Sequence, residues 1–343
     1  MSDLSPRQQT ILSLVIREHV AQANPISSRM LLQQYDLGVS SATVRNEMAR
    51  LEELGYLTHP HTSAGRVPTD MGYRFFVERL LGEVTLPAAE QRLITHQFHQ
   101  ARLDLSQWMR LAATTLSQKA RSASLVTAPQ AEQSLFKHIE LISTQGRLVL
   151  LILVLQGGNV QQQMLTLAEP LTQAELSQTT DRINQLCSGM GVSEIRARVQ
   201  GLPTFEAEIC DLVLEMMERS DTRMTGEIYR DGLSEMLSQP EFMGAESSQG
   251  ALRLLEERSF LDNFLAETLN PSVGGVQVII GGEGRWEELS KCSMVLARYG
   301  VPGFATGALG VLGPIRMSYG RAISTVRFVA ELMSDLVYEM YTY

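Results

Sequence analysis

The first eighty residues show the clearest alternation of apolar and polar positions in the chain. Apolar residues recur at helical spacing through residues 5–22, where Ser5 can cap a helix and Pro6 suits its first turn. A short second helix is expected to follow, capped by Ser27 or Ser28.

A third helix is expected to begin at Ser40 or Ser41 and to end at Leu54, directly before a glycine. A short strand over 56–58, a polar loop over 59–69 and a helix over 70–82 follow. Three short helices, a strand and a polar loop are the outline of a winged helix-turn-helix.

The rest of the chain mixes helices and strands, which indicates an α+β protein. The pattern predicts helices over 88–128 (one or two), 172–187, 204–219, 249–269 and 320–341. It predicts strands over Leu135–Ile142, Arg147–Gln156, 160–167, Val276–Ile280, Met294–Tyr299 and Gly307–Met317, with a hairpin at Gly157-Gly158-Asn159. Residues 221–240 follow no clear pattern, and the mixed stretch 171–239 is interpreted as an insertion.

Composition places the chain among soluble globular proteins of two or three domains. It has 343 residues, 44% apolar and 20% charged. The longest apolar run, Leu148–Leu155, is too short for a membrane span, and the N-terminus has no signal-peptide pattern. Cys187, Cys210 and Cys292 are widely spaced without a CxxC motif, which fits a reduced cytoplasm and argues against a disulfide framework or a thiolate metal site. We therefore expect a cytoplasmic protein.

Net charge does not by itself suggest a nucleic-acid partner. The whole chain carries a charge of −9, and residues 1–88 hold eight Arg, no Lys and nine Asp plus Glu, a net charge of −1. Any affinity for DNA must come from where the arginines lie, and a single copy should bind weakly.

The predicted third helix has two distinct sides. Val44, Met48, Leu51 and Leu54 gather on one side, which should pack on the first two helices. The other side offers side chains that can read base edges or contact phosphates, namely Ser40, Ser41, Ala42, Thr43, Arg45, Asn46, Ala49 and Arg50. Small polar residues are also common on ordinary surface helices, so this pattern alone leaves both interpretations open.

The following loop favours the DNA-binding interpretation. It combines a cation with hydroxyls and a glycine, in His61, Thr62, Ser63, Gly65 and Arg66. A wing that reaches a phosphate or the minor groove would use Arg66 in this way.

Four motifs in this order resemble the heat-inducible transcription repressors of the HrcA family. They are Ser41-Ala42-Thr43-Val44-Arg45-Asn46-Glu47-Met48, Leu51-Glu52-Glu53-Leu54-Gly55-Tyr56-Leu57, His61-Thr62-Ser63-Ala64-Gly65-Arg66-Val67-Pro68-Thr69 and Gly72-Tyr73-Arg74. The resemblance is dense over residues 5–80 and continues more loosely to the end, for example through His138-Ile139 and Gly310–Tyr319.

The resemblance implies a dimeric repressor of heat-shock chaperone operons that binds an inverted-repeat operator in double-stranded DNA. It also implies a GAF-like domain interrupted by a dimerising insertion, and stabilisation by the GroEL chaperonin. Together with the predicted elements, it divides the chain into a winged helix-turn-helix (1–88), the first part of a GAF-like domain (89–170), an inserted dimerisation domain (171–239) and the second GAF-like part (240–343).

Other candidate sites are weak. The glycines at 281–284 and 303–313 lack the lysine of a P-loop and the spacing of a dinucleotide fold, so turns explain them better. His59 and His61 have no visible third ligand for zinc. No nucleophile, base and orienting group gather after residue 88, so we expect no enzyme, no cofactor and no metal.

The sequence therefore predicts a homodimeric, DNA-binding repressor. The main alternative is a winged-helix regulator whose GAF-like domain binds a metabolite. An enzyme with an accessory DNA-binding domain is disfavoured, because no catalytic group gathers after residue 88.

Overall fold

The chain forms two compact units, one of them built from three separate segments. The computed structural model describes residues 4–60, 65–101, 104–131, 134–156, 160–199, 201–222, 226–243, 245–269, 272–281, 285–302 and 304–342. The first unit comprises Met1–Ala128, Glu227–Gly300 and Gly307–Tyr343, and the second comprises Pro129–Gly226 and Val301–Thr306. Within these described ranges, no helix is long and apolar enough to cross a membrane.

The first unit begins with three helices that match the predicted ones. The helices are α1 (Pro6–Gln22), α2 (Ser28–Gln34) and α3 (Ser41–Glu53). Their caps are Ser5, Ser27 and Ser40, and each serine side chain accepts a hydrogen bond from the backbone N–H three residues later. An antiparallel pair of strands and a helical segment follow, namely β1 (Leu57–Thr58), β2 (Val67–Pro68), α4 (Asp70–Phe75) and the π-helical turn η1 (Phe76–Leu80).

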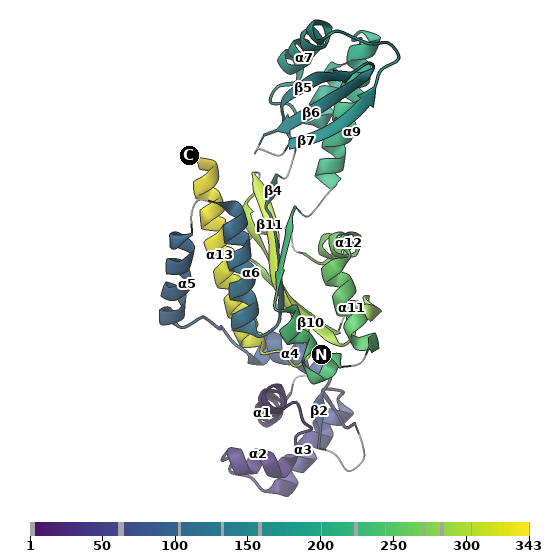
Figure 1. The fold of residues 1–343 in the computed structure, drawn as a ribbon. Coiled ribbons are helices and arrows are strands. Elements are labelled where there is room, and N and C mark those ends of the chain that lie inside the picture. The colour runs from purple at the N-terminus through teal and green to yellow at the C-terminus, as the bar shows by residue number, and fades with distance from the viewer. Residues whose placement is uncertain are drawn as a thin grey trace. The chain divides into compact units, whose positions relative to one another are not determined.

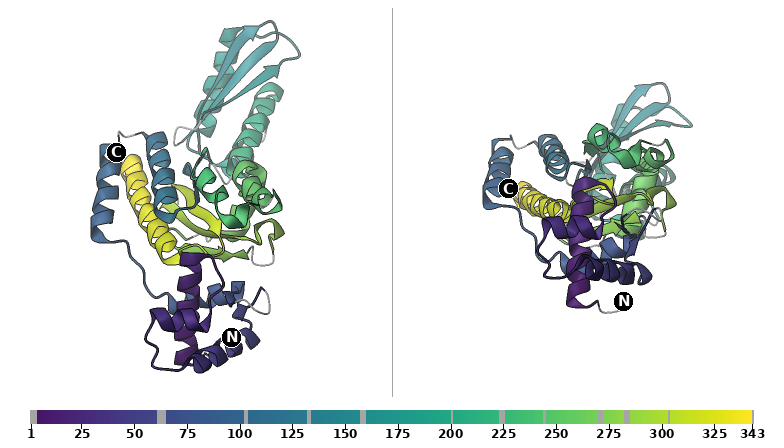
Figure 2. Two further views of the ribbon diagram at one scale, coloured as in Figure 1. Left: turned by 60° about the horizontal axis from the view of Figure 1, so that its bottom comes forward. Right: turned by 90° about the horizontal axis from the view of Figure 1, so that it is seen from below.

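Five strands of a six-stranded sheet form the centre of the first unit, with helices on both faces (Figures 1 and 2). Its strands run in the order β8 (Ile228–Asp231), β3 (Ala123–Thr127), β11 (Ala305–Pro314), β10 (Cys292–Val301) and β9 (Val276–Ile280), and β4 (Gln130–Ala131) pairs with β11. One face is covered by α6 (Leu105–Ala120) and α13 (Tyr319–Thr342), and the other by α11 (Ala245–Glu256) and α12 (Arg258–Thr268). The remaining elements are α5 (Ala88–Gln100), α10 (Leu233–Leu237) and the short 3-10 helices η2 (Pro240–Phe242) and η4 (Glu287–Leu289).

Two predictions for this unit are wrong. The predicted helical region 88–128 ends at Ala120, because Arg121 adopts a left-handed backbone (φ +52°) and residues 123–127 form a strand. All five residues of that strand are buried, so it lacks the alternation that reveals a half-exposed strand. The predicted helix over 249–269 is two helices, because Glu257 between them has an extended backbone.

Tyr73 on α4 links the N-terminal helices to the sheet. Its hydroxyl lies 2.6 Å from Nδ1 of His19 on α1, and its ring centroid lies 5.8 Å from that of Tyr319 on α13. Burial lowers the pKa of His19, and the Arg316 guanidinium lowers it further. A neutral imidazole therefore shares this hydrogen bond with the Tyr73 hydroxyl.

Two arginines complete this junction. A guanidinium nitrogen of Arg316 lies 3.1 Å from Oε2 of Glu241, and another lies 3.5 Å from the carbonyl oxygen of Val20 at the end of α1. Arg74 on α4 donates a 2.9 Å hydrogen bond to the carbonyl oxygen of Val278 on β9. These bonds fix α1 and α4 to the sheet portion of the same unit.

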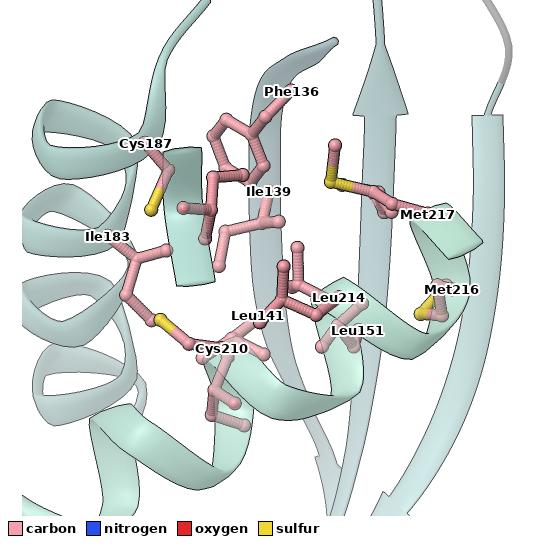
Figure 3. Close-up of a cluster of buried hydrophobic side chains, with 14 of the residues drawn as sticks. Phe136, Ile139, Leu141, Leu151, Ile183, Cys187, Cys210, Leu214, Met216 and Met217 are labelled. Carbon is pink, nitrogen blue, oxygen red and sulfur yellow. The ribbon is translucent and has the colours of Figure 1, made fainter. Parts of the chain in front are cut away.

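The second unit is a three-stranded antiparallel sheet packed against helices. Its strands run in the order β5 (Phe136–Gln145), β6 (Leu148–Leu155) and β7 (Val160–Thr166), and its helices are α7 (Gln173–Cys187), α8 (Val192–Arg198) and α9 (Thr204–Thr222). Figure 3 shows the buried cluster between this sheet and the helices. The three strands match the predicted ones, whereas the predicted hairpin at 157–159 lies outside the described residues. The unit's bounds differ from the expected insertion at 171–239, because β5–β7 pack with α7–α9 while residues 227–239 belong to the first unit.

Gly72 in α4 provides a test of this packing. A Cβ at Gly72 would overlap the carbonyl oxygen of Tyr56, whereas a Cβ at Gly320 in α13 would make ordinary 3.4 Å contacts. Gly72→Ala is expected to lower the free energy of unfolding by about 1–3 kcal/mol. Gly320→Ala should leave it unchanged or raise it by up to about 1 kcal/mol, because alanine favours helix. Urea unfolding followed by circular dichroism measures both, and equal changes would contradict the predicted clash.

Candidate nucleic-acid interface

Helix α3 has one buried side and one exposed side, as its sequence pattern predicts. Val44, Met48 and Leu51 are at most 1% exposed, and α3 contacts α1 and α2. The opposite side is open to solvent at Ser41, Ala42, Arg45, Asn46 and Arg50, whereas Thr43 and Ala49 are half-buried. The candidate reading side is therefore accessible over its first two turns.

Arg45 and Asn46 present free polar groups on this side. Neither side chain makes a hydrogen bond or an ion pair within the part of the chain that the structure describes. Arg50 pairs with Glu53 at 2.7 Å, but both side chains are more than half exposed, so this pair is weak. Guanidinium and amide groups in these positions can make the paired hydrogen bonds that distinguish guanine and adenine.

The carboxylates of α3 all have partners, which limits their repulsion of a polyanion. Glu47 accepts a 3.2 Å hydrogen bond from Gln8 and lies 3.7 Å from an Arg7 guanidinium nitrogen. Glu53 pairs with Arg50, and Glu52 pairs with residues of the following loop. None of the three carboxylates is therefore an isolated negative charge on the side that would approach DNA.

Glu52 joins α3 to the segment between β1 and β2. One carboxylate oxygen accepts a 2.8 Å hydrogen bond from Nε of Arg66, and the other pairs with Nδ1 of His59. Desolvation raises the pKa of Glu52, but the hydrogen bonds from His59 and Arg66 outweigh it and hold that pKa below its ordinary value. The carboxylate is therefore ionised and can hold both side chains.

Hydrogen bonds also hold the backbone at Gly65 and Arg66 in place. The N–H and C=O of Ile26 form two 2.8 Å hydrogen bonds with the backbone of Arg66. A Cβ at Gly65 would lie 2.6 Å from the Ile26 carbonyl, so this close approach requires glycine. Gly65 and Arg66 thus have a structural role, which the sequence pattern did not reveal. The other loop candidates, His61, Thr62 and Ser63, lie outside the described residues.

The N-terminus of α3 can accept an anion. Ser40 uses its hydroxyl to cap the N–H of Thr43 at 3.2 Å, and the hydroxyl of Ser41 lies 3.4 Å from that of Ser28. The first turn of α3 carries no acidic residue, so the positive end of the helix dipole is not neutralised locally.

Sequence reasoning missed Arg29, which follows Ser28 in the first turn of α2. Its side chain is exposed and makes no hydrogen bond or ion pair with any described residue. An arginine is unfavourable near the positive N-terminal end of a helix dipole. Its presence there could have indicated a role outside the helix, such as contact with a phosphate. Among the described residues, no group of three His, Cys, Asp or Glu side chains could hold a metal ion.

The chain is similar to known repressors over nearly its whole length. Residues 106–323 match the family described as HrcA protein C terminal domain. A heat-inducible transcription repressor HrcA from Roseiflexus castenholzii is 46% identical over 99% of this chain and 96% of its own length. A protein of the same name from Dehalococcoides mccartyi is 39% identical, over 98% and 97% of the two chains.

A solved structure supports the fold. It is described as a crystal structure of a hypothetical protein, and it matches with a TM-score of 0.61 and 22% identity over 98% of both chains. Because the family match covers most of the chain and the relatives align almost end to end, this chain belongs to the HrcA family of heat-inducible transcription repressors.

Proposed function

We propose that the chain represses transcription by placing α3 in the major groove of an operator. In this proposal α1–α3 with β1 and β2 act as a winged helix-turn-helix. The observation that carries it is the exposed, unpartnered pair Arg45 and Asn46 near the start of a helix whose carboxylates are all paired. Recognition helices read bases with their N-terminal residues, where this pair lies.

Each side chain of this surface has a proposed partner. Arg45 and Arg50 pair with guanine, Asn46 pairs with adenine, and the Ala42 and Ala49 methyl groups meet thymine. Phosphates are contacted by the Ser40–Thr43 end of α3 and by Arg29.

The wing is the loop between β1 and β2. Its hydroxyl and imidazole groups, those of His61, Thr62 and Ser63, contact the backbone or the minor groove of DNA. Arg66 directs this loop through Glu52, to which its Nε is bound, while its charge attracts phosphate.

We further propose that the repressor acts as a homodimer on an inverted-repeat operator. The DNA-binding domain over residues 1–88, called the reading head below, has a net charge of −1 and should bind DNA weakly by itself. A second reading head joined to it raises the affinity through avidity. The second unit is the proposed dimerising insertion in a GAF-like domain. It has an open sheet face where Leu150, Ile152 and Val154 are half-buried and Met164 is 54% exposed, which is apolar area that a partner would cover.

The apolar sheet face of the second unit also suggests how a chaperonin could control repressor activity. Warming that loosens the dimer exposes more apolar area, and such states are what a chaperonin binds. We propose that GroEL returns the repressor to its active form and that unfolded proteins compete for GroEL during heat shock.

A metabolite-sensing regulator is the second candidate. A cleft of about 900 Å³ lies between α4 and β9, lined in part by Arg74, Arg285 and Trp286, so a ligand there would contact the reading head directly.

Alanine variants test the reading surface. Arg45→Ala and Asn46→Ala are each expected to weaken operator binding by about 1–3 kcal/mol without changing stability, because both side chains are exposed and unpaired. Fluorescence anisotropy measures this on an operator recovered from genomic fragments, whose footprint should span two symmetric half-sites. Arg17→Ala, exposed on α1, is the control. Variants that bind as tightly as the control would exclude this face of α3.

The Glu52 contact predicts a change in DNA affinity opposite to the one expected from charge alone. Glu52→Gln removes a negative charge near the DNA, yet it is expected to weaken binding by about fivefold because Arg66 and His59 lose their anchor. Glu53→Gln, on the same helix but outside this contact, should bind equally well or more tightly. Dissociation constants at three salt concentrations measure both, and tighter binding by both variants would rule out the anchoring role.

Heating tests chaperonin control against ligand control. Purified protein free of small molecules is expected to lose operator binding on mild heating and to regain it with GroEL and ATP. The same preparation without chaperonin is the control. If that control stays fully active through the host's heat-shock temperature, chaperonin control fails and the ligand-sensing candidate moves ahead.

A further inference from the structure

The core of the second unit contains two cysteines on facing helices. Cys187 is the last residue of α7, and Cys210 lies in α9. Their side chains are 0% and 1% exposed, and both are free thiols. Figure 3 shows their sulfur atoms pointing toward one another across the buried cluster. Neither the DNA surface nor the proposed dimer uses them.

The surroundings make the two thiols chemically unequal. The neighbouring Cys210 thiol lowers the pKa of Cys187 more than burial raises it, and the nearby Arg198 lowers it further. The same contact and burial raise the pKa of Cys210. Charges outside the pair set the order: Arg198 lowers the pKa of Cys187, whereas Asp211 and Glu206 raise that of Cys210. Cys187 is therefore the better nucleophile of the pair, and Cys210 is the thiol that reacts with an oxidised Cys187.

The position of Cys187 gives an oxidant access. The helix ends at this residue, and Gly189 just beyond it adopts a left-handed backbone (φ +78°). Helix ends open locally at far lower cost than helix interiors. A small neutral oxidant can reach the sulfur during such openings, and the same freedom lets it approach Cys210 to the bonding distance of about 2.05 Å.

We propose that Cys187 and Cys210 are a redox modification site, where hydrogen peroxide converts the two thiols into a reversible disulfide within one chain. The Cys187 thiolate attacks one peroxide oxygen, the O–O bond breaks, and a sulfenic acid and one water form after protonation. The Cys210 sulfur then attacks the Cys187 sulfur, the S–O bond breaks, and a second water leaves. Two thiols lose two electrons and two protons, and one peroxide becomes two waters.

The disulfide would fasten α7 to α9 and enclose α8. A cross-link stabilises a fold mainly by restricting its unfolded chain, and the two helices are already packed together here. Oxidation therefore makes the second unit more resistant to heat. The site responds to hydrogen peroxide, which is a signal distinct from temperature and from any metabolite.

Thiol counting on the full-length protein tests the site without any substitution. The native protein is treated with hydrogen peroxide, denatured, alkylated and weighed by mass spectrometry. We expect alkylation at one cysteine after oxidation and at three in the reduced sample, with a peptide that joins Cys187 to Cys210. Cys292 is an internal reference, because burial raises its pKa to about 12 and keeps it a thiol. Three alkylated cysteines after oxidation, or a cross-link between two chains, would overturn the proposal.

Thermal unfolding tests the consequence. The oxidised protein should unfold about 10 °C higher than the reduced one, and dithiothreitol should reverse the shift. Cys292→Ala should retain the shift, whereas Cys187→Ala and Cys210→Ala should abolish it. A cross-linked protein that unfolds at an unchanged or lower temperature would refute the stabilising role.

Discussion

The carboxylate of Glu52 is the contact on which the proposed DNA surface depends. It belongs to α3 but binds two side chains of the loop segment, so it sets the loop's position relative to the reading helix. It also bears on an electrostatic problem: a chain with a net negative charge is proposed to approach DNA, which is a polyanion. In α3 each carboxylate is matched to a neighbour, which leaves Arg45 with no competing partner among the described residues. Placement of charge, more than its total, makes this surface suitable for DNA.

The junction around Tyr73 and Arg316 gives the reading head a mechanical connection to the sheet. Contacts from α1 reach α4 and α13, and α4 is bonded to β9. A change in the sheet portion of the first unit would therefore move α1, on which α3 packs. Such a connection serves either candidate mode of control, since loosening by heat and binding of a ligand in the cleft beside β9 both act on the same contacts.

Local signals in the sequence predicted local structure well. Serine caps and helical spacing located α1–α3 and separated the buried from the exposed side of α3. Most of the misses depend on long-range packing, whereas the break between α11 and α12 at Glu257 is local. Residues 123–127 form a fully buried central strand without alternation, and no pattern shows that β5–β7 pack with α7–α9. Likewise, the contact of Glu52 with Arg66 and the meeting of Cys187 and Cys210 arise only when separate elements come together.

The order of segments in the first unit has a consequence for how the protein is made. β3 is translated early, but its sheet neighbours are β8, which follows the segment Pro129–Gly226 of the second unit, and β11, which lies close to the end of the chain. Strand pairs so distant in sequence form slowly, because the intervening chain must first be closed into a loop. The second unit pairs consecutive strands and can fold as soon as it leaves the ribosome. Until β8 and β11 have been made, β3 lacks both of its sheet partners, and five residues that are buried in the folded chain have no strand to pair with. Incomplete states of this kind are what chaperones bind at any temperature.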